Sequence, residues 1–392
     1  METKIINQYE DFVGLKDDWH DLLARDKNSV FFLTFEWLNA WWKNYGSGQE
    51  LFIILALDSG RILGAAPLMI KSTRFRNIVL SRKLQFIAHE VSDYMDFVIP
   101  SQEKEVYALI FETIKKNMNL WDWAEFSFIR DDSAYFKDWL YAAKDSVFLK
   151  TKISADDVAV AIHMYKEAGS YDELEKRLPN QERLRRVLRK KRNKFLREIQ
   201  GASFRRTKDF TLIKEQVGSF AQQHCKRLQV KGLKSQFEDQ RYASYFLDVA
   251  RDISPYEQGL LSTISRDGES IAMAFGFIYN NRYYHYLSNF NERFSKYSPS
   301  ELLVRFMLES FYEEGKVKKF DFLRGGERYK FDWSKEKLSL FTIQLYPKRL
   351  KGAFCYAAVL MKNLFAPLLQ HLSFLINKIR EKTKNLYVRK AF

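Results

Sequence analysis

Two groups of strand-forming segments joined by tight turns constrain the fold of this chain more than any other feature. The first, "LFIILALDSGRILGAAPLMIK", reads as two strands joined at Asp58-Ser59-Gly60. The second covers residues 259–290 and reads as a three-strand meander with turns at Asp267-Gly268 and Asn280-Asn281. These residues readily supply the positive backbone angles of a two-residue hairpin turn. Each group is therefore expected to form antiparallel strands.

The order of elements around the two groups is the same, which indicates an internal duplication. In the first half, we expect helices at 12–25, 34–45 (capped by Thr34), 103–118 and 133–143. In the second half, we expect helices at 210–229, 238–252 and 299–314. Further strands are expected at 84–88, 93–99, "WAEFSFI", the segment up to 164, "KKFDFL" and "LSLFTIQLY". The segments "DSGRILGAAPL" and "RDGESIAMAFGF" are the local echo between the two halves.

We therefore predict an α+β chain of two similar domains, a basic linker helix and a helical tail. The predicted segments are an N-terminal domain at 1–165, a linker-helix region at 166–205, a C-terminal domain at 206–348 and a basic amphipathic tail at 349–392. Apolar residues recur at helical spacing in the linker and in the tail, so one face of each helix is expected to pack. Pro367 should kink or split the tail helix.

Charge and apolar content narrow the classes of partner and of location. The formal net charge is +15; residues 183–197 hold nine basic residues and no acid, and residues 348–392 hold ten basic residues against one acid. Polyanions, anionic lipids and phosphate-bearing ligands are therefore candidate partners. The two cysteines, Cys225 and Cys355, provide neither a disulfide framework nor a metal site. No apolar run reaches 18 residues and the first residues lack a signal pattern, so we expect a cytoplasmic protein.

The segment "KYSPSELLVRFM" reads as the start of a helix. Ser298 is the expected cap, Pro299 suits the first helical position, and Glu301 would complete a capping box. A helix end can instead direct free backbone N–H groups at an anion. Both interpretations stay open at this point.

Several motifs together resemble the tandem GNAT (acetyltransferase-fold) proteins, and among them the CelD/FemAB-like group associated with bacterial polysaccharide or envelope synthesis. The motifs are "TFEWLNAWW", "ILGAAPL", "RLRRVLRKKRNKF", "YHYLSNFNERFSKYSPSELL" and "FDFLRGGERYKFDW". Their order across residues 30–346 carries more weight than any one of them. The resemblance implies two GNAT-like domains and an acyl-CoA-dependent transfer.

The resemblance also implies where acetyl-CoA, or another acyl-CoA, would lie as co-substrate. Its pyrophosphate would meet the helix that begins at Ser298, and its pantetheine arm would pair with the meander strand that ends at Phe290. The implied binding residues are Leu287, Ser288, Ser298, Ser300, Glu301 and Leu302. Ser300 stands where related chains usually carry Gly, and the carboxylate of Glu301 would compete with a phosphate.

Acyl transfer to an amine needs a base, donors for the oxyanion and an acid for the departing thiolate. The Gly-Gly turn of "DFLRGGERYKFDW" places candidates close together. Asp321 or Glu327 is the candidate base, Tyr329 the candidate acid, and Lys330 a candidate anion-binding residue. His285 is a further candidate base, or else a packed strand residue. No metal is expected.

The segment "AHEVSDYMDF" is the counterpart in the first half and is expected to line the acceptor side. His89, Asp93 and Asp96 are the candidates there, suited to an amine or an amino sugar. The alternative is a solvated loop.

We therefore expect an acyltransferase that acts on an amine or hydroxyl of a small molecule or glycan precursor. One alternative is a Fem-like transferase that takes an aminoacyl group from tRNA. Another is a catalytically silent subunit of polysaccharide synthesis at the inner membrane face, which Ser300 and Glu301 would favour. Residues 350–390 are the expected peripheral membrane contact, and packing of this tail on its own domain is the alternative.

Overall fold

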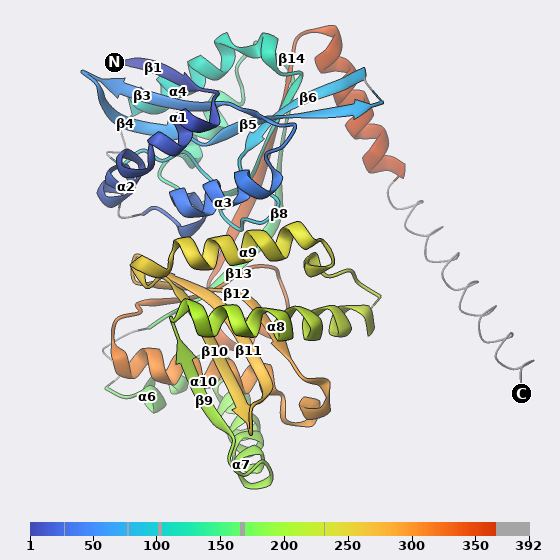
Figure 1. Cartoon of the computed structure of the whole chain (residues 1–392). Coiled ribbons are helices and arrows are strands. Elements are labelled where there is room, and N and C mark those ends of the chain that lie inside the picture. The colour runs from blue at the N-terminus through green and yellow to red at the C-terminus, as the bar shows by residue number, and fades with distance from the viewer. Residues whose placement is uncertain (27, 77, 101–103, 165–168, 231, 366–392) are drawn as a thin grey trace, which may run out of the picture.

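The computed structural model describes residues 1–26, 28–76, 78–100, 104–164, 169–230 and 232–365. Within them, one 11-stranded sheet has the order β2-β5-β6-β7-β14-β8-β13-β12-β11-β10-β9, and a 3-stranded sheet has the order β1-β3-β4. Figure 1 shows two stacked halves, each with helices packed against its strands. No described helix is long and apolar enough to cross a membrane.

The first half contains the two sheets' N-terminal strands and the helices that cover them. Its strands are β1 (Glu2–Ile6), β2 (Glu50–Leu51), β3 (Ile53–Asp58), β4 (Arg61–Ala66), β5 (Leu68–Phe75), β6 (Ile78–Phe86), β7 (Trp123–Arg130) and β8 (Phe148–His163). Its helices are α1 (Tyr9–Gly14), α2 (Lys16–Arg25), α3 (Phe35–Tyr45), α4 (Lys104–Lys116) and α5 (Phe136–Ala142). Ser59 and Gly60 have the positive φ angles expected of the hairpin turn between β3 and β4.

The second half repeats the order of helices, meander, helix and strands. Its strands are β9 (Ser203–Thr207), β10 (Gly259–Arg266), β11 (Glu269–Tyr279), β12 (Arg282–Phe290), β13 (Lys319–Arg324) and β14 (Lys337–Pro347). Its longer helices are α8 (Phe210–Val230), α9 (Gln240–Asp252) and α10 (Pro299–Glu314), and α11 (Lys330–Trp333) is a single turn. Asp267, Asn280 and Asn281 have the positive φ values that the predicted turns require.

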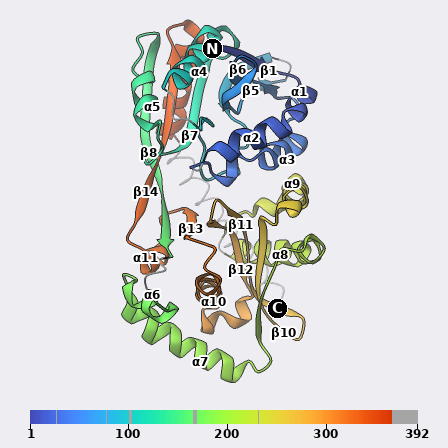
Figure 2. The ribbon, with the colours of Figure 1, turned by 90° about the vertical axis from the view of Figure 1, so that its left-hand side faces the viewer.

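In the sequence, the two halves are linked by α6 (Tyr171–Arg177) and a basic helix, which is η4 (Arg183–Leu188) continued by α7 (Arg189–Glu198). Leu184, Leu188 and Phe195 are buried and Ile199 is partly buried, so most of the predicted apolar stripe packs, but Val187 is exposed. Figure 2 shows α7 running beneath α10 at the far end of the second half. Residues 350–365 are helical, and the rest of the predicted tail lies outside the described residues.

The two halves exchange their last strands. β14 pairs with β7 on one side and with β8 on the other, while the end of β8 pairs with β13. Figure 2 shows β8 and β14 running along one side of both halves. A boundary at residue 165 therefore separates the halves in sequence, whereas the sheet itself is continuous across them. The predicted domain boundaries stay predictions.

A matching bulge marks the duplication in three dimensions. Phe128 in β7 has φ 64° and Leu323 in β13 has φ 62°. Both residues lie where the ladder to the exchanged strand shifts register, at Phe341/Ile343 for β7 and at Asp321/Arg324 for β13. A left-handed angle is costly for a residue with a side chain, so its recurrence at equivalent places indicates a feature held by the surrounding structure.

Two sequence expectations about elements were wrong. The expected strand at 93–99 is an irregular segment whose only described bridge joins Val98 to Ala65. Its apolar residues, Tyr94, Met95, Phe97, Val98 and Ile99, are buried but do not alternate, and the N–H of Phe97 donates to the carboxylate of Asp96 instead of to a partner strand. The helix expected at 12–25 starts at Tyr9 and is divided at Leu15 into α1 and α2.

Candidate functional site

The strands β12 and β13 separate after a short parallel pairing. Only Arg282, Tyr283 and Tyr284 are paired with β13, and the last pair joins Tyr284 to Asp321. The β11–β12 ladder shifts register between Phe275 and Phe277, opposite the residues that follow Tyr284, and β13 is irregular at Leu323. From His285 onward the edge of β12 is therefore without a partner strand on this side within the described residues.

A cavity of about 290 Å³ lies at this separation, beside the start of α10. It is lined by Arg227, His285, Ser288, Phe290, Ser295, Ser298, Pro299, Ser300, Glu301, Val304 and Tyr329. We call it the α10 cavity. It combines the strand edge, the helix start and the loop after β13, which the sequence places far apart.

The start of α10 is not the capping box that the sequence predicts. Ser298 is the N-cap residue and Pro299 follows it, but Ser298 has left-handed angles (φ 54°, ψ 58°) and its side chain makes no cap hydrogen bond. Its hydroxyl instead accepts a hydrogen bond from Lys191 of α7. Glu301 Oε2 lies 2.9 Å from Arg183 Nη2. The side chains of Ser298 and Glu301, which the sequence predicts to form a capping box, are therefore bound by the basic helix instead.

Several polar groups at the α10 cavity have no partner among the described residues. The first helical N–H groups, those of Ser300 and Glu301, donate to no described acceptor, whereas the N–H of Leu302 donates to Ser298 O at 3.0 Å. Ser300 Oγ and His285 Nδ1 are buried and make no hydrogen bond. Buried polar atoms in proteins are nearly always paired, so the gathering of these groups at one cavity makes it a candidate ligand site.

Four of the six predicted donor-binding residues line the α10 cavity, and two do not. Ser288, Ser298, Ser300 and Glu301 line the α10 cavity. Leu302 is fully buried in the core of the second half, so it could offer only backbone atoms. Leu287 packs against the larger core that the two halves share. Their binding roles stay predictions.

Two of the predicted catalytic residues face the α10 cavity. Burial, with a further contribution from Lys330, lowers the pKa of His285 to about 3, so its imidazole is neutral at physiological pH. Burial, with a further contribution from Glu327, raises the pKa of Tyr329 to about 12, so its hydroxyl remains protonated. Tyr329 is thus able to donate a proton, whereas His285 is a weak base.

The other three lie around the end of β13. Asp321 is buried and accepts hydrogen bonds at 2.8 Å from the Tyr94 hydroxyl and from the Leu323 N–H. Lys330 is buried and donates to the carbonyl oxygens of Leu323 (3.2 Å) and Arg324 (2.7 Å). Its ammonium also lies 2.8 Å from the exposed carboxylate of Glu327. Lys330 thus holds the Gly-Gly turn in place, and its donors are engaged.

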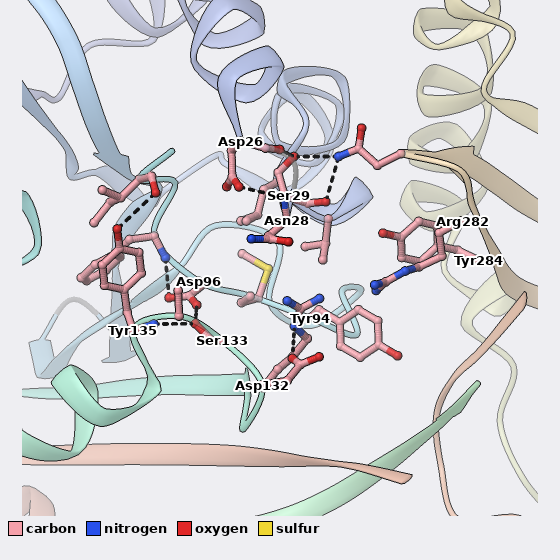
Figure 3. Close-up of a pocket in the computed structure, with 18 residues that line it drawn as sticks. Asp26, Asn28, Ser29, Tyr94, Asp96, Asp132, Ser133, Tyr135, Arg282 and Tyr284 are labelled. Carbon is pink, nitrogen blue, oxygen red and sulfur yellow. Dashed lines mark hydrogen bonds and ion pairs between the residues drawn. The ribbon is translucent and has the colours of Figure 1, made fainter. Parts of the chain in front are cut away.

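A second cavity, of about 340 Å³, lies between the halves. Figure 3 shows Arg282 and Tyr284 of the second half approaching from one side, opposite Asp96, Ser133 and Tyr135 of the first half. We call it the interdomain cavity. Further polar residues that line it are Asp26, Asn28, Ser29, Tyr94, Arg130, Asp132 and Asn280.

The interdomain cavity holds charges of both signs. Burial raises the pKa of Asp26 and of Asp96, so both carboxyl groups bind protons more readily than usual. Arg130 Nε lies 3.0 Å from Asp132 Oδ1, while Arg130 Nη1 is buried and without a hydrogen bond. Such a cavity suits a polar ligand that has both an anionic group and hydroxyl or amino groups.

The predicted acceptor residues do not come together. Asp96 lines the interdomain cavity, but its carboxylate accepts bonds from Ser133, from Trp139 Nε1 at 3.0 Å and from the Phe97 N–H. His89 Nδ1 lies 3.1 Å from both Gln85 Nε2 and Glu90 Oε2. Their roles stay predictions.

The side chain of Asp93 instead contacts a residue of the second half. Arg324 Nε donates to Asp93 Oδ1 at 3.2 Å. Burial raises the pKa of Asp93 to about 6, even though Arg324 and Lys330 oppose the shift. A carboxylate with a pKa near neutrality at the meeting of two domains is a candidate for proton transfer.

Sequence reasoning missed the cations that build the site. Arg183 and Lys191 were recognised only as part of a basic run, and their contacts with Glu301 and Ser298 span more than 100 positions. For Arg130 and Arg282, the only local indication was the position of a charged residue next to the end of a predicted strand.

Comparison with known proteins agrees with this architecture. Residues 182–331 match the family described as an acetyltransferase (GNAT) domain. No curated protein sequence matches the chain. The crystal structure of FemX superposes with a TM-score of 0.58 at 12% identity, over 87% of this chain and 97% of that chain.

Two other solved structures are similar. A conserved protein of unknown function from Bacteroides thetaiotaomicron gives a TM-score of 0.55 at 10% identity, over 87% of this chain and 100% of that chain. The C-terminal domain of a putative lysylphosphatidylglycerol synthetase from Agrobacterium fabrum gives a TM-score of 0.52 at 11% identity, over 89% of this chain and 96% of that chain.

The fold is therefore that of the GNAT proteins, which confirms the predicted fold class. The second half carries the match to a GNAT acetyltransferase domain, and the separated strands and the α10 cavity lie within it.

Proposed function

We propose that the chain transfers an acyl group from acyl-CoA, bound in the α10 cavity, to an amine or hydroxyl bound in the interdomain cavity. The observation that carries this proposal is the convergence of unpaired polar groups on one cavity: the N–H groups of Ser300 and Glu301, Ser300 Oγ and His285 Nδ1. A phosphate-bearing ligand beside a strand edge satisfies all of them.

The donor would be held by two parts of the α10 cavity. The N–H groups at the helix start would bind the pyrophosphate, and the free edge of β12 after Tyr284 would pair with the amides of the pantetheine arm. The helix dipole contributes only about 0.3–1 kcal/mol, so the strand edge and nearby cations must supply most of the affinity. Arg183 neutralises the carboxylate of Glu301, which otherwise would repel the phosphate.

The two cavities lie on opposite faces of β12. Tyr284 lines the interdomain cavity and the next residue, His285, lines the α10 cavity. Successive side chains in a strand point to opposite faces. The strands separate at this pair of residues, so a donor on one face would reach an acceptor on the other through the opening.

Asp93 and Tyr329 are suited to the two proton transfers. A neutral amine attacks the thioester carbonyl, and its proton passes to a base; the C–S bond then breaks and the thiolate takes a proton from an acid. Asp93, with a pKa of about 6, is our candidate base. Tyr329, protonated and lining the α10 cavity, is our candidate acid. Asp321 and Glu327 are less suited because they are held by Tyr94 and Lys330 respectively.

On the acceptor side we propose an amino sugar or a related glycan precursor. The interdomain cavity offers guanidinium groups from Arg130 and Arg282 for an anionic substituent, and carboxyl and amide groups for hydroxyl and amino groups. A cytoplasmic location and a role in envelope or polysaccharide synthesis belong to the same proposal.

Calorimetric titration with acetyl-CoA tests the donor site. The wild-type chain should bind with micromolar affinity, and Ser300→Phe, which fills the α10 cavity, should weaken binding at least about tenfold. Ser310→Phe, on the same helix and outside the cavity, is the matched control. Absence of binding by the wild-type chain would remove acyl-CoA as the donor.

The second candidate donor is an aminoacyl-tRNA. The basic helix favours it, because Arg185, Arg186 and Arg189 lie together on its outer side and line a shallow surface hollow. Such an array binds a nucleic-acid backbone with a strong dependence on salt. Binding of charged tRNA at low salt that is lost in Arg185→Gln/Arg186→Gln, together with no binding of acetyl-CoA, would select this donor.

A further inference from the structure

The tip of the β5–β6 hairpin carries large apolar side chains that no described residue covers. Phe75 and Ile78 are 62% and 65% exposed, and Val79 and Leu80 are exposed beside them. Figure 1 shows the hairpin projecting from the first half. Single exposed apolar residues are common on proteins, but a group of them at a projecting tip marks a contact surface.

Cations surround this tip and acids are absent. The segment from Lys71 to His89 holds five Lys or Arg residues and no Asp or Glu. The basic residues nearer the base of the hairpin are paired with acids: Lys71 with Glu90, Arg82 with Glu50 and Lys83 with Glu125. Arg74 and Arg76 are exposed and form no ion pair with any described residue; the Arg76 guanidinium lies 5.7 Å from the centre of the Phe75 ring.

The helix at 350–365 presents a second apolar surface. Leu350 and Phe354 are 92% and 65% exposed, and Met361, Leu364 and Phe365 continue the same helical spacing in exposed positions. The opposite side of this helix is anchored, since Cys355 is buried and the ring of Tyr356 lies 5.2 Å from that of Tyr346. From Lys337 to Phe365 the sequence contains no acidic residue.

The hairpin and this helix meet at their bases. Asp122 accepts a hydrogen bond from the N–H of Arg82 in β6 at 2.9 Å, and its other oxygen lies 3.3 Å from Arg349 at the start of the helix. The ring of Trp123 stacks on Tyr346 and lies under the ammonium of Lys83. Two segments that are more than 250 positions apart in the sequence are thereby fixed at the same end of the molecule, as Figure 1 shows.

We propose that the β5–β6 tip and the exposed stripe of helix 350–365 form one docking surface for an anionic lipid bilayer. Apolar side chains would enter the interfacial layer while Arg74 and Arg76 pair with lipid phosphates. The absence of acids from both segments favours an anionic surface over a mixed-charge protein partner. The contact that we propose is peripheral. This proposal does not depend on the acyl-transfer proposal.

Vesicle flotation of the full chain tests this surface. The probes are phosphatidylcholine vesicles and vesicles with about 30% phosphatidylglycerol; we expect binding to the anionic vesicles to be at least about tenfold stronger. Phe75→Ser/Ile78→Ser, Leu350→Ser/Phe354→Ser and Arg74→Gln/Arg76→Gln should each lower the partition coefficient about tenfold or more. Leu212→Ser/Leu233→Ser is the matched control, because both residues are exposed apolar residues of the second half.

The changed side chains are exposed, so the variants should keep the wild-type circular dichroism spectrum and melting temperature. Unchanged binding of the Phe75/Ile78 variant would overturn the proposal. So would equal binding to both kinds of vesicle. A lipid-free dimer that the same variants abolish, with vesicle binding unaffected, would assign the surface to a second copy of the chain instead.

Discussion

Arg183 Nη2 lies 2.9 Å from Glu301 Oε2, and this ion pair joins the basic helix to the first turn of α10. The second terminal nitrogen of Arg183 lies 2.9 Å from Asp332 after β13. One guanidinium thus binds both Glu301, which lines the α10 cavity, and Asp332 in the segment after β13. The charge that the sequence places at the helix start is thereby balanced by a residue 118 positions away.

This pair makes a double-mutant test of the donor site. Arg183→Gln leaves the Glu301 carboxylate unbalanced at the phosphate position, so acetyl-CoA should bind about tenfold more weakly, which corresponds to about 1.4 kcal/mol. Glu301→Gln should bind as tightly as the wild-type chain or tighter, and the double variant should recover most of the loss. Calorimetry measures all four constants, and equal affinity of Arg183→Gln and wild type would show that the pair does not act on the ligand.

Asp93 gives a prediction about the pH dependence of the rate. Since its pKa is raised to about 6 by burial, the carboxylate needed for proton abstraction forms as the pH rises through this value. The rate at saturating substrate should therefore increase between about pH 5 and pH 7, and Asp93→Asn should lower kcat by about 100-fold or more and remove this step. Asp156→Asn, at an exposed residue of β8, is the control and should leave the profile unchanged.

The same group should make stability depend on pH in a definite direction. The native state binds a proton at Asp93 between about pH 4 and pH 6, where the unfolded state has released it, so the free energy of unfolding falls as the pH rises through this range. The shift corresponds to roughly 3 kcal/mol in total. Asp93→Asn should lack this decline; identical pH profiles of denaturant unfolding for both chains would contradict the assignment.

Gly276 in β11 is expected to be intolerant of any side chain. A Cβ atom there would lie 2.3 Å from the carbonyl oxygen of Tyr284 and 2.4 Å from the Tyr283 hydroxyl. Gly276→Ala should therefore lower the free energy of unfolding by about 1–3 kcal/mol. It should also weaken the binding of both the acyl-CoA donor and the acceptor, because Tyr284 must shift. Gly218→Ala in α8 meets nothing within 4 Å and should be neutral or stabilising by up to about 1 kcal/mol. Urea unfolding of the two variants makes the comparison.

The buried pair of Glu175 and Arg305 anchors α10 to α6. Arg305 Nε donates to Glu175 Oε1 at 3.0 Å, and both side chains are almost completely buried. Removing Glu175 leaves the buried Arg305 guanidinium with Glu309, 3.4 Å away, as its remaining ion-pair partner, so Glu175→Ala should cost up to about 3–5 kcal/mol. Glu313→Ala is the control, because Glu313 is an exposed residue of α10. It should lower the free energy of unfolding by less than about 1 kcal/mol, and thermal unfolding of the two variants makes the comparison.

Most elements of this fold follow from local sequence patterns. The turns at Gly60 and Asp267, and the helix at 299–314, appear where the sequence predicts them because glycine, asparagine and helical periodicity act over a few residues. The strand exchange was not predictable, because β14 pairs with residues of β7 and β8 that lie more than 170 positions earlier in the sequence. The segment at 93–99 shows the same limit, since burial in an irregular segment and burial in a strand select similar residues.

The position of the candidate site in the backbone could be predicted from the sequence, but the ion pairs around it could not. The place of the α10 start after the meander was read from the order of elements. The pairing of Glu301 with Arg183 and of Asp93 with Arg324 depends on how distant segments pack. A local motif such as S-x-x-E cannot reveal that a distant cation binds its carboxylate more effectively than its own helix end does.

The strand exchange also has a consequence for how the chain acquires its structure. Gln344 on β14 bonds to Glu125 on β7, 219 positions earlier. During synthesis, the edge of β7 therefore stays unpaired until β14, at residues 337–347, has left the ribosome. Loop closure over such distances is slow, and an uncovered edge readily pairs with the wrong strand. We expect refolding to be a single slow event for both halves, with aggregation as its main competitor and with no separately stable N-terminal fragment.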